Sequence, residues 1–205
     1  TITVTDGTTP ETVDVNLLTV GASHVNAFAG VNGPADTDGD GVVDNESALG
    51  LQLSDVNFAM AMMKVKTPTT GSPTDLRSWT SLKAEVGSAS FVGIDGLAVS
   101  VSDFSVAINQ GRGTKNGVAN TTVADFSTDA LTVKTGPASS IVLTFDGSKG
   151  ALLEAAGHVT LEVFSFFYVD GGFAFKKSSE TITVTDGTTP ETVDVNLLTV
   201  GASHV

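Results

Sequence analysis

An Asp/Gly-rich loop near residue 40 carries the clearest chemical signal in the sequence. Residues 36–44 read DTDGDGVVD. Counted from the first aspartate, carboxylates fall at positions one, three, five and nine, and a glycine at position six permits a sharp turn. Oxygen ligands at this spacing predict a calcium site of weak, extracellular type, with the ligands Asp36, Asp38, Asp40, Val42 (through its carbonyl) and Asp44.

This loop departs from the helix-flanked form of such a site. Position twelve is Ser47 rather than a glutamate, the nearest acid is Glu46, and no helical pattern flanks the loop. A surface loop that its charges keep soluble is the alternative interpretation.

The histidines are the next candidates for chemistry. They are His24, its copy His204, and His158, and each lies at a sequence corner where other corners carry Asp55 or Asp103. A catalytic triad needs a nucleophile beside a histidine, and no nucleophile-elbow sequence is present. We therefore predict that these histidines have a structural role and satisfy amides in turns.

Two glutamates, Glu154 and Glu162, lie near the aromatic-rich segment 159–175. An isolated pair of this kind is more typical of a solvated strand face than of the paired carboxylates of a glycosidase. Because neither the histidines nor the glutamates form a recognisable catalytic set, the sequence predicts a protein that is not an enzyme.

The chain contains a direct repeat. Residues 1–25 read TITVTDGTTPETVDVNLLTVGASHV, and residues 181–205 repeat them without a substitution. The period is therefore 180 residues, which exceeds that of ordinary solenoid repeats. We predict one complete repeat unit at 1–180 and the start of the next, identical unit at 181–205. An engineered duplication is the alternative.

Composition and charge exclude some classes of partner. The second copy holds three of the 23 acidic residues and none of the ten basic ones, so a 180-residue unit has a net charge of −10. Such a chain repels nucleic acid, and none is expected as a partner. No apolar run approaches the ~20 residues of a membrane helix, so no membrane span is expected in this segment. The absence of cysteine excludes disulfides and thiolate sites.

Apolar and polar residues alternate along most of the chain, which predicts an all-β fold. Turn residues at 6–10 and 136–137 predict two hairpins, and the Asp-Gly-Gly sequence at 170–172 predicts a third. Only residues 76–86 suggest a brief helix.

A small or polar pair precedes several of the alternating stretches, and each pair predicts a bend. Successive bends favour an elongated β-solenoid-like or coiled-sheet repeat unit. The alternative is a set of β-sandwich units joined end to end, whose strands cross between sheets. The pairs are Ser23-His24, Ser54-Asp55, Gly87-Ser88, Ser102-Asp103 and Gly157-His158.

Three phrases resemble the repeats of giant secreted bacterial proteins. They are VNLLTVGASHVNAFAGVNG at 15–33, LQLSDVNFAMAMM at 51–63 and VFSFFYVDGGFAFKKS at 163–178. The similar proteins are the RTX-like, type I-secreted adhesins of cell surfaces and biofilm matrices. This resemblance implies an extracellular or cell-surface location, calcium-assisted folding, and an adhesive or scaffolding role.

Together these features predict a structural repeat of an extracellular bacterial fibre or stalk. Its partners would be neighbouring repeats of the same chain, with lateral association of other copies left open. The alternative is a calcium-dependent adhesin module that binds a surface or glycan through loops 67–75 or 110–120. In the fibre, sheet pairing would join successive units at a repeat junction formed by Phe173, Phe175, Thr181, Ile182, Val184, Val193, Val195 and Leu197.

Overall fold

The computed structural model describes residues 1–33, 47–67, 74–164 and 166–205, and it confirms the predicted all-β fold. Among the residues so described, one 3-10 turn, η1, interrupts the strands. In chain order the elements are β1 (Ile2–Thr5), β2 (Pro10–Val13), β3 (Val15–Val31), β4 (Leu49–Val65), β5 (Ser78–Val92), β6 (Leu97–Arg112), β7 (Thr114–Lys115), β8 (Val118–Ala119), β9 (Val123–Ala124), β10 (Leu131–Lys134), β11 (Ser140–Leu143), η1 (Gly147–Lys149), β12 (Leu152–Val163), β13 (Phe167–Thr185) and β14 (Pro190–Ser203).

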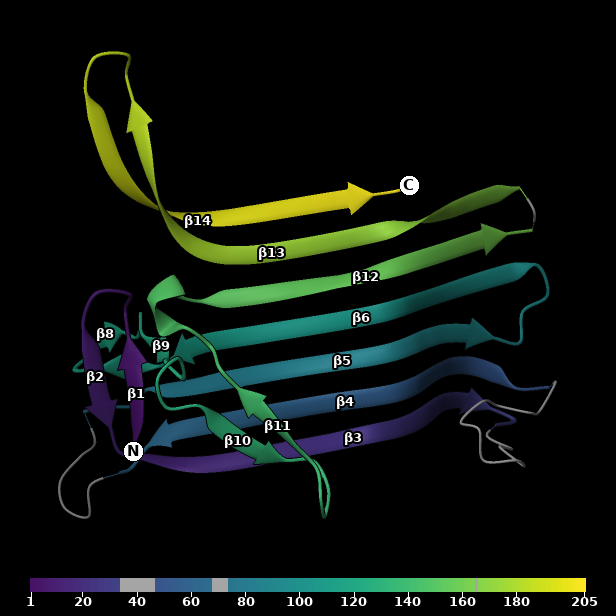
Figure 1. Ribbon diagram of the computed structural model, residues 1–205, viewed down its shortest axis with the longest axis horizontal. Helices are drawn as coiled ribbons and strands as arrows, with labels where there is room; N and C mark the ends of the chain where they lie inside the picture. The colour runs from purple at the N-terminus through teal and green to yellow at the C-terminus, as the bar shows by residue number, and fades with distance from the viewer. Residues whose placement is uncertain (34–46, 68–73, 165) are drawn as a thin grey trace.

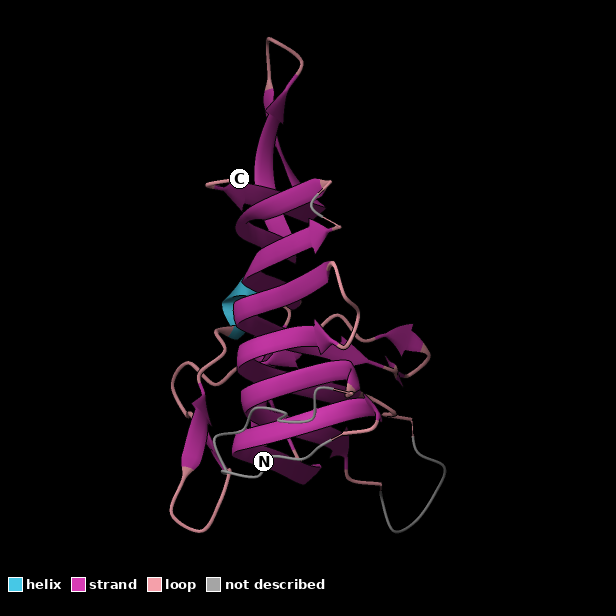
Figure 2. Cartoon of the chain, turned by 90° about the vertical axis from the view of Figure 1, so that its right-hand side faces the viewer, coloured by secondary structure: helices cyan, strands magenta, loops and turns pink. Residues whose placement is uncertain are grey.

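A seven-stranded antiparallel sheet in the order β14-β13-β12-β6-β5-β4-β3 organises the molecule (Figure 1). Its strands are 12 to 19 residues long, whereas strands of about 5–6 residues are usual. Figure 2 shows them stacked in one twisted column. The two edges of this sheet are β3 and β14.

Smaller sheets cover one end of the large one. β1 pairs with β2 and β9, and β10 pairs with β11. Along β4 the side chains of Ala59, Ala61 and Met63 are buried while Met62 is exposed, as expected for a strand with one covered face. The core at this end consists of Ile2, Val4, Val13, Val15, Ala59, Ala61, Met63, Trp79, Ala124, Phe126, Val133 and Leu143.

The predicted bends lie in one row across the large sheet. The pairs on either side place Asp55 on β4 opposite Gly87 on β5, and Gly87 opposite Asp103 on β6, at a position that both ladders skip. The next ladder shifts its register beside Gly157, and the β3–β4 ladder shifts beside His24. The φ angles of His24, Asp55 and Asp103 are 53°, 53° and 51°, in the left-handed region. Each is therefore a bulge-like kink within a long strand.

The predicted brief helix at 76–86 is wrong, because most of this segment belongs to β5. Trp79 and Ser81 are buried, while Lys83 and Glu85 are exposed further along the same face. β5 also pairs with β4 on one side and β6 on the other. Ladders of backbone hydrogen bonds on both sides of the strand override the local helical preference.

The hairpin predicted at 170–172 is also wrong, since β13 runs through these residues. The chain reverses earlier, between the paired residues Val163 and Phe167. Asp170 accepts a hydrogen bond from Thr160 Oγ1 at 2.8 Å and contacts His158 Nε2 at 2.9 Å, both on β12. These contacts hold the segment in the sheet. The hairpins predicted at 6–10 and 136–137 are confirmed.

Candidate interface at the repeat junction

β3 and β14 carry copies of one sequence at the two edges of the large sheet. β14 repeats residues 10–23, and β3 begins at Val15 within the same stretch. Six antiparallel ladders separate the two strands, so they run in the same direction (Figure 1). One sequence therefore occupies both ends of the sheet in the same orientation.

The N-terminal copy pairs with the strand that follows it in the chain. The β3–β4 ladder begins at Val15 opposite Val65 and continues through Leu18 opposite Met62. The other side of β3 has no strand among the residues that the structure describes.

The C-terminal copy pairs with the strand that precedes it. β13 continues without interruption past the predicted unit boundary between residues 180 and 181 and then pairs with β14. The structure thus brings the predicted junction residues into one ladder, and their role between units stays a prediction. Phe173 and Phe175 face Ala202 and Val200; Thr181, Ile182 and Val184 face Asp194, Val193 and Glu191; Val195 and Leu197 face Glu180 and Ser178.

The two copies form the same local hairpin. Ile2 pairs with Val13, and Ile182 pairs with Val193 in the same register. At the turn, Asp6 Oδ1 accepts hydrogen bonds from the amides of residues 8 and 9 at 2.9 Å each, and Asp186 does the same for residues 188 and 189. These bonds lower the pKa of each aspartate to about 2.

Burial distinguishes the copies. Ile2 is 8% exposed and Val4 is fully buried, whereas Ile182 is 40% exposed and Val184 is 41% exposed. The N-terminal hairpin packs into the core at the end of the large sheet. The C-terminal hairpin extends beyond the sheet, at the upper left of Figure 1.

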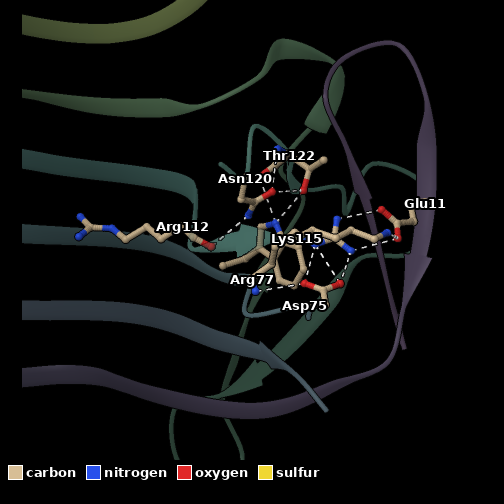
Figure 3. Close-up of polar contacts among 8 residues, drawn as sticks. Glu11, Asp75, Arg77, Arg112, Lys115, Asn120 and Thr122 are labelled. Carbon is tan, nitrogen blue, oxygen red and sulfur yellow. Dashed lines mark hydrogen bonds and ion pairs between the residues drawn. The ribbon is translucent and has the colours of Figure 1, made fainter. Parts of the chain in front are cut away.

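An ionic cluster ties the N-terminal hairpin to the large sheet (Figure 3). Arg77 donates from Nη1 to Glu11 on β2 at 2.8 Å and from Nη2 to Asp75 at 2.8 Å. Lys115 on β7 donates to the same Glu11 at 2.5 Å. The guanidinium lies 5.2 Å from the ring centroid of Trp79, which favours a cation–π contact. Three separate parts of the chain therefore meet in this cluster, which contains the buried Arg77.

The charged groups in this cluster shift one another's pKa values. The side chain of Arg77 is only 4% exposed. Hydrogen bonds from Arg77 and then from Lys115 lower the pKa of Glu11 to about 2. The same guanidinium lowers the pKa of Asp75 and has its own pKa raised by both carboxylates. Glu191, the copy of Glu11, lies exposed opposite Val184.

The β10–β11 hairpin holds the N-terminal copy from a second direction. Ser23 Oγ lies 3.1 Å from Ser139 Oγ. A Cβ at Gly21 would lie 2.5 Å from the carbonyl oxygen of Lys134, closer than real contacts allow. At Gly201, the copy of Gly21, a Cβ would have nothing within 4 Å. This hairpin therefore covers the first copy and requires glycine there.

Sequence reasoning missed the Arg77 cluster. One signal was available, because the chain has ten basic residues against 23 acidic ones and Arg77 lies between Asp75 and the single tryptophan. Burial of Trp79 predicts burial of its neighbours, and a buried arginine needs carboxylates. The spacing of residues in the sequence could not predict that Glu11 is this partner.

The calcium ligands Asp36, Asp38, Asp40, Val42 and Asp44 lie outside the described residues, and the calcium site stays a prediction. Within the described residues, no group of three or more His, Asp or Glu side chains is placed to hold a metal.

The side chains of His24 and His158 contact aspartates rather than turn amides. His24 Nδ1 lies 2.7 Å from Asp55 Oδ1 across the β3–β4 ladder. The amides at this bend donate instead to asparagines: His24 N donates to Asn57 Oδ1, and Asp55 N donates to Asn26 Oδ1, both at 3.0 Å. The prediction that His24 satisfies turn amides is therefore wrong, because two asparagine side chains already do so.

The two glutamates and the loop 110–120 lie in separate parts of the fold. Glu154 faces Lys176 and Glu162 faces Tyr168 towards opposite ends of β12, so the two carboxylates stay apart. Within the predicted adhesin loop 110–120, β7 and β8 form a small hairpin, and Lys115 belongs to the Arg77 cluster.

None of the helices in the described parts of the chain is long and apolar enough to cross a membrane. No family model, no curated protein and no solved structure matches the chain.

Proposed function

We propose that the chain is a structural repeat segment of an extracellular bacterial fibre or stalk, in which one coiled β-sheet continues from each 180-residue unit into the next. The observation that carries the proposal is the behaviour of the repeated sequence. The first copy, as β3, pairs with β4, and the second copy, as β14, pairs with β13.

The two pairings use opposite sides of the same strand. β3 and β14 run in the same direction, β4 lies on one side of β3, and β13 lies on the other side of β14 (Figure 1). A single strand within a longer chain can therefore hold β13 of one unit and β4 of the next at the same time. This compatibility supports a continuous sheet.

The number of strands supports the same arrangement. One period contributes β3, β4, β5, β6, β12 and β13, which is six strands. Because six is even, each unit begins in the same direction as the last, and units can follow one another by simple translation and twist. At about 4.8 Å per strand, one unit would add roughly 29 Å to the fibre.

The exposed edge of β3 also supports the proposal, because it is suited to pairing with a further strand. Leu17, Leu18 and Val20 are 46%, 56% and 38% exposed along a 17-residue strand. Long apolar edges are sites of further strand pairing. In the C-terminal copy, Val200 faces Phe175, so a preceding unit would place its own Phe175 opposite Val20.

The N-terminal and C-terminal hairpins also suit a continuous fibre. η1 contacts both β1 and β13, so it lies between the first hairpin and the strand that leads into the second. Along the fibre, each hairpin would then cover the end of the sheet in its own unit, and the following hairpin would do the same in the next unit. The extracellular location rests on the resemblance of three phrases to secreted bacterial repeats and on a β-rich composition with few charged residues.

Lengthening the chain by one complete 180-residue unit tests the proposal. Small-angle scattering and cryo-electron microscopy should show a particle longer by roughly 29 Å with an unchanged cross-section. Two separate lobes joined by a mobile connection would contradict a continuous sheet. A control chain with the same units, and with a flexible glycine-serine linker inserted between residues 180 and 181, should show such lobes.

A further inference from the structure

We infer that residues 181–205 of one chain can replace residues 1–25 of a second copy of the same chain, so that β14 of the first copy pairs with β4 of the second. The inference rests on the proposed sheet continuity but concerns association between chains. The length of a tandem chain tests continuity alone, so failure of one idea is distinguishable from failure of the other.

The C-terminal copy already has the shape of the segment that it would replace. The sequences are identical, the hairpin register is the same, and His24 and His204 have φ angles of 53° and 54°. The inserting segment therefore needs little rearrangement. Its apolar side chains, with Ile182 and Val184 40% and 41% exposed, would enter the core that buries Ile2 and Val4.

The binding partner must be a second copy of the chain. β14 and β4 of one chain are separated by β13, β12, β6 and β5. At about 4.8 Å per strand, these five steps amount to roughly 24 Å, so β14 cannot reach its own β4. Only another molecule can bring the matching β4, β10–β11 hairpin and Arg77 to the C-terminal copy.

Each contact of the replaced segment has an identical substitute. The donor's Glu191 would take the place of Glu11 against the acceptor's Arg77, and its Gly201 would take the place of Gly21 under Lys134. The donor strand keeps its own ladder with β13. The released N-terminal segment gains conformational freedom, which favours the exchange, while the loss of independent motion of two molecules opposes it. Assembly should therefore depend on concentration.

The exchange has a natural boundary at the bend near His24. The exchanged segment 181–205 is the copy of residues 1–25, so the exchange reaches the position of Val25. The acceptor keeps its own pairing beyond this point, from Ala27 opposite Leu53 to Val31 opposite Leu49. The ladder already shifts its register on both sides of Val25, so the acceptor chain can leave the sheet there.

Two glycines at identical positions give a matched test in the full-length chain. Gly21→Val would clash with the carbonyl of Lys134 and weaken the N-terminal copy, while Gly201→Val would meet open space in the separate molecule. We expect Gly21→Val to shift the chain towards oligomers and filaments, with Trp79 still buried under a donor segment. Gly201→Val should reduce assembly below that of the unsubstituted chain.

The double variant decides the question, because neither copy can then fill the core. It should stay monomeric and show a red-shifted Trp79 emission. If Gly21→Val alone matches the double variant in size distribution and emission, no donor segment has entered and the inference fails. Analytical ultracentrifugation and fluorescence of the single tryptophan supply both readings.

Cross-linking tests the register of the exchange. Leu18 faces Met62, so Leu198 of a donor would face Met62 of an acceptor. Because the chain has no cysteine, Leu198→Cys and Met62→Cys chains mixed under mild oxidation should form a disulfide heterodimer. Adding Gly21→Val to the acceptor should increase the yield severalfold.

Leu51→Cys is the matched control acceptor. Leu51 is also exposed on β4, but it faces Ala29 beyond the reach of the donor. Equal yields from the two acceptors, or no heterodimer with Met62→Cys, would overturn the inference. The second result would also identify any remaining assembly as simple contact between edges β14 and β3.

Discussion

Residues 1–25 and 181–205 are the same sequence in two different surroundings. In both copies the hairpin has the same register, the turn aspartate accepts the same hydrogen bonds, and its pKa falls to about 2. In the first copy Val4 is fully buried, while in the second Val184 is 41% exposed. Local structure is therefore independent of the surroundings, and burial is not.

The difference between the copies identifies what each unit must supply. The first copy is covered by β9, by the β10–β11 hairpin and by the residues that bind Glu11, and all of these follow it in the chain. The second copy has the same apolar face without these elements. Burial of the first copy thus depends on elements that lie far along the chain from it.

The largest expected effect comes from removing the cation that holds the first copy. Arg77→Met should lower the free energy of unfolding by about 3 kcal/mol, because Asp75 loses its buried partner and Glu11 keeps only Lys115. Urea unfolding followed by circular dichroism measures the change. Lys83→Met is the control, since the Lys83–Glu85 ion pair is exposed and should change stability by about 0.5 kcal/mol or less. Equal effects would show that the cluster does not hold the hairpin.

Truncating the same valine in each copy sharpens the contrast in burial. Val4→Ala should cost about 2 kcal/mol, through lost burial of two methyl groups and the cavity that remains. Val184→Ala should cost about 0.5 kcal/mol or less, because the side chain is partly exposed. Thermal and urea unfolding of the two variants measure the difference. Similar losses would mean that the second copy is covered in solution, as exchange between chains requires.

The matched glutamates should differ in their dependence on pH. The folded-state pKa of Glu11 is about 2 against an ordinary 4.5, so its contribution is present above about pH 4.5 and is lost as the pH falls towards 2. Glu11→Gln should cost about 1 kcal/mol at pH 7, a value reduced by the partial exposure of the carboxylate, and much less at pH 2. Glu191→Gln should be nearly neutral at both values. Urea midpoints measured at the two pH values make the comparison.

The turn aspartates should show no difference between the copies. Asp6 and Asp186 accept the same hydrogen bonds, so NMR titration of their side-chain carbons should give a pKa of about 2 for each. Asp6→Asn and Asp186→Asn should then produce equal, small changes in the unfolding midpoint. Two clearly separated pKa values would mean that the tertiary surroundings, and not the turn, set the local structure.

The sequence predicted the features that depend on neighbouring residues. Alternation predicted the β-strands, turn residues predicted the hairpins at 6–10 and 136–137, and the recurring small or polar pairs anticipated the row of bends that includes Asp55 and Asp103. The predictions from sequence failed where pairing between strands overrode the preferences of neighbouring residues. Glycines at 171 and 172 stay within β13 because Asp170 is bonded to β12, and residues 76–86 join β5 because both of its sides are paired.

By itself, the sequence determined the all-β fold, the 180-residue period and the hairpin that both copies share. Its reason is physical: a turn such as that at Asp6 is closed by hydrogen bonds to residues two and three positions away. Only the tertiary structure decided that one copy is buried and the other is exposed. The contacts that bury the first copy join residues 66 positions apart for Glu11 and Arg77 and 116 positions apart for Ser23 and Ser139. The second copy has the same residues, and no such partner within its own chain can reach it.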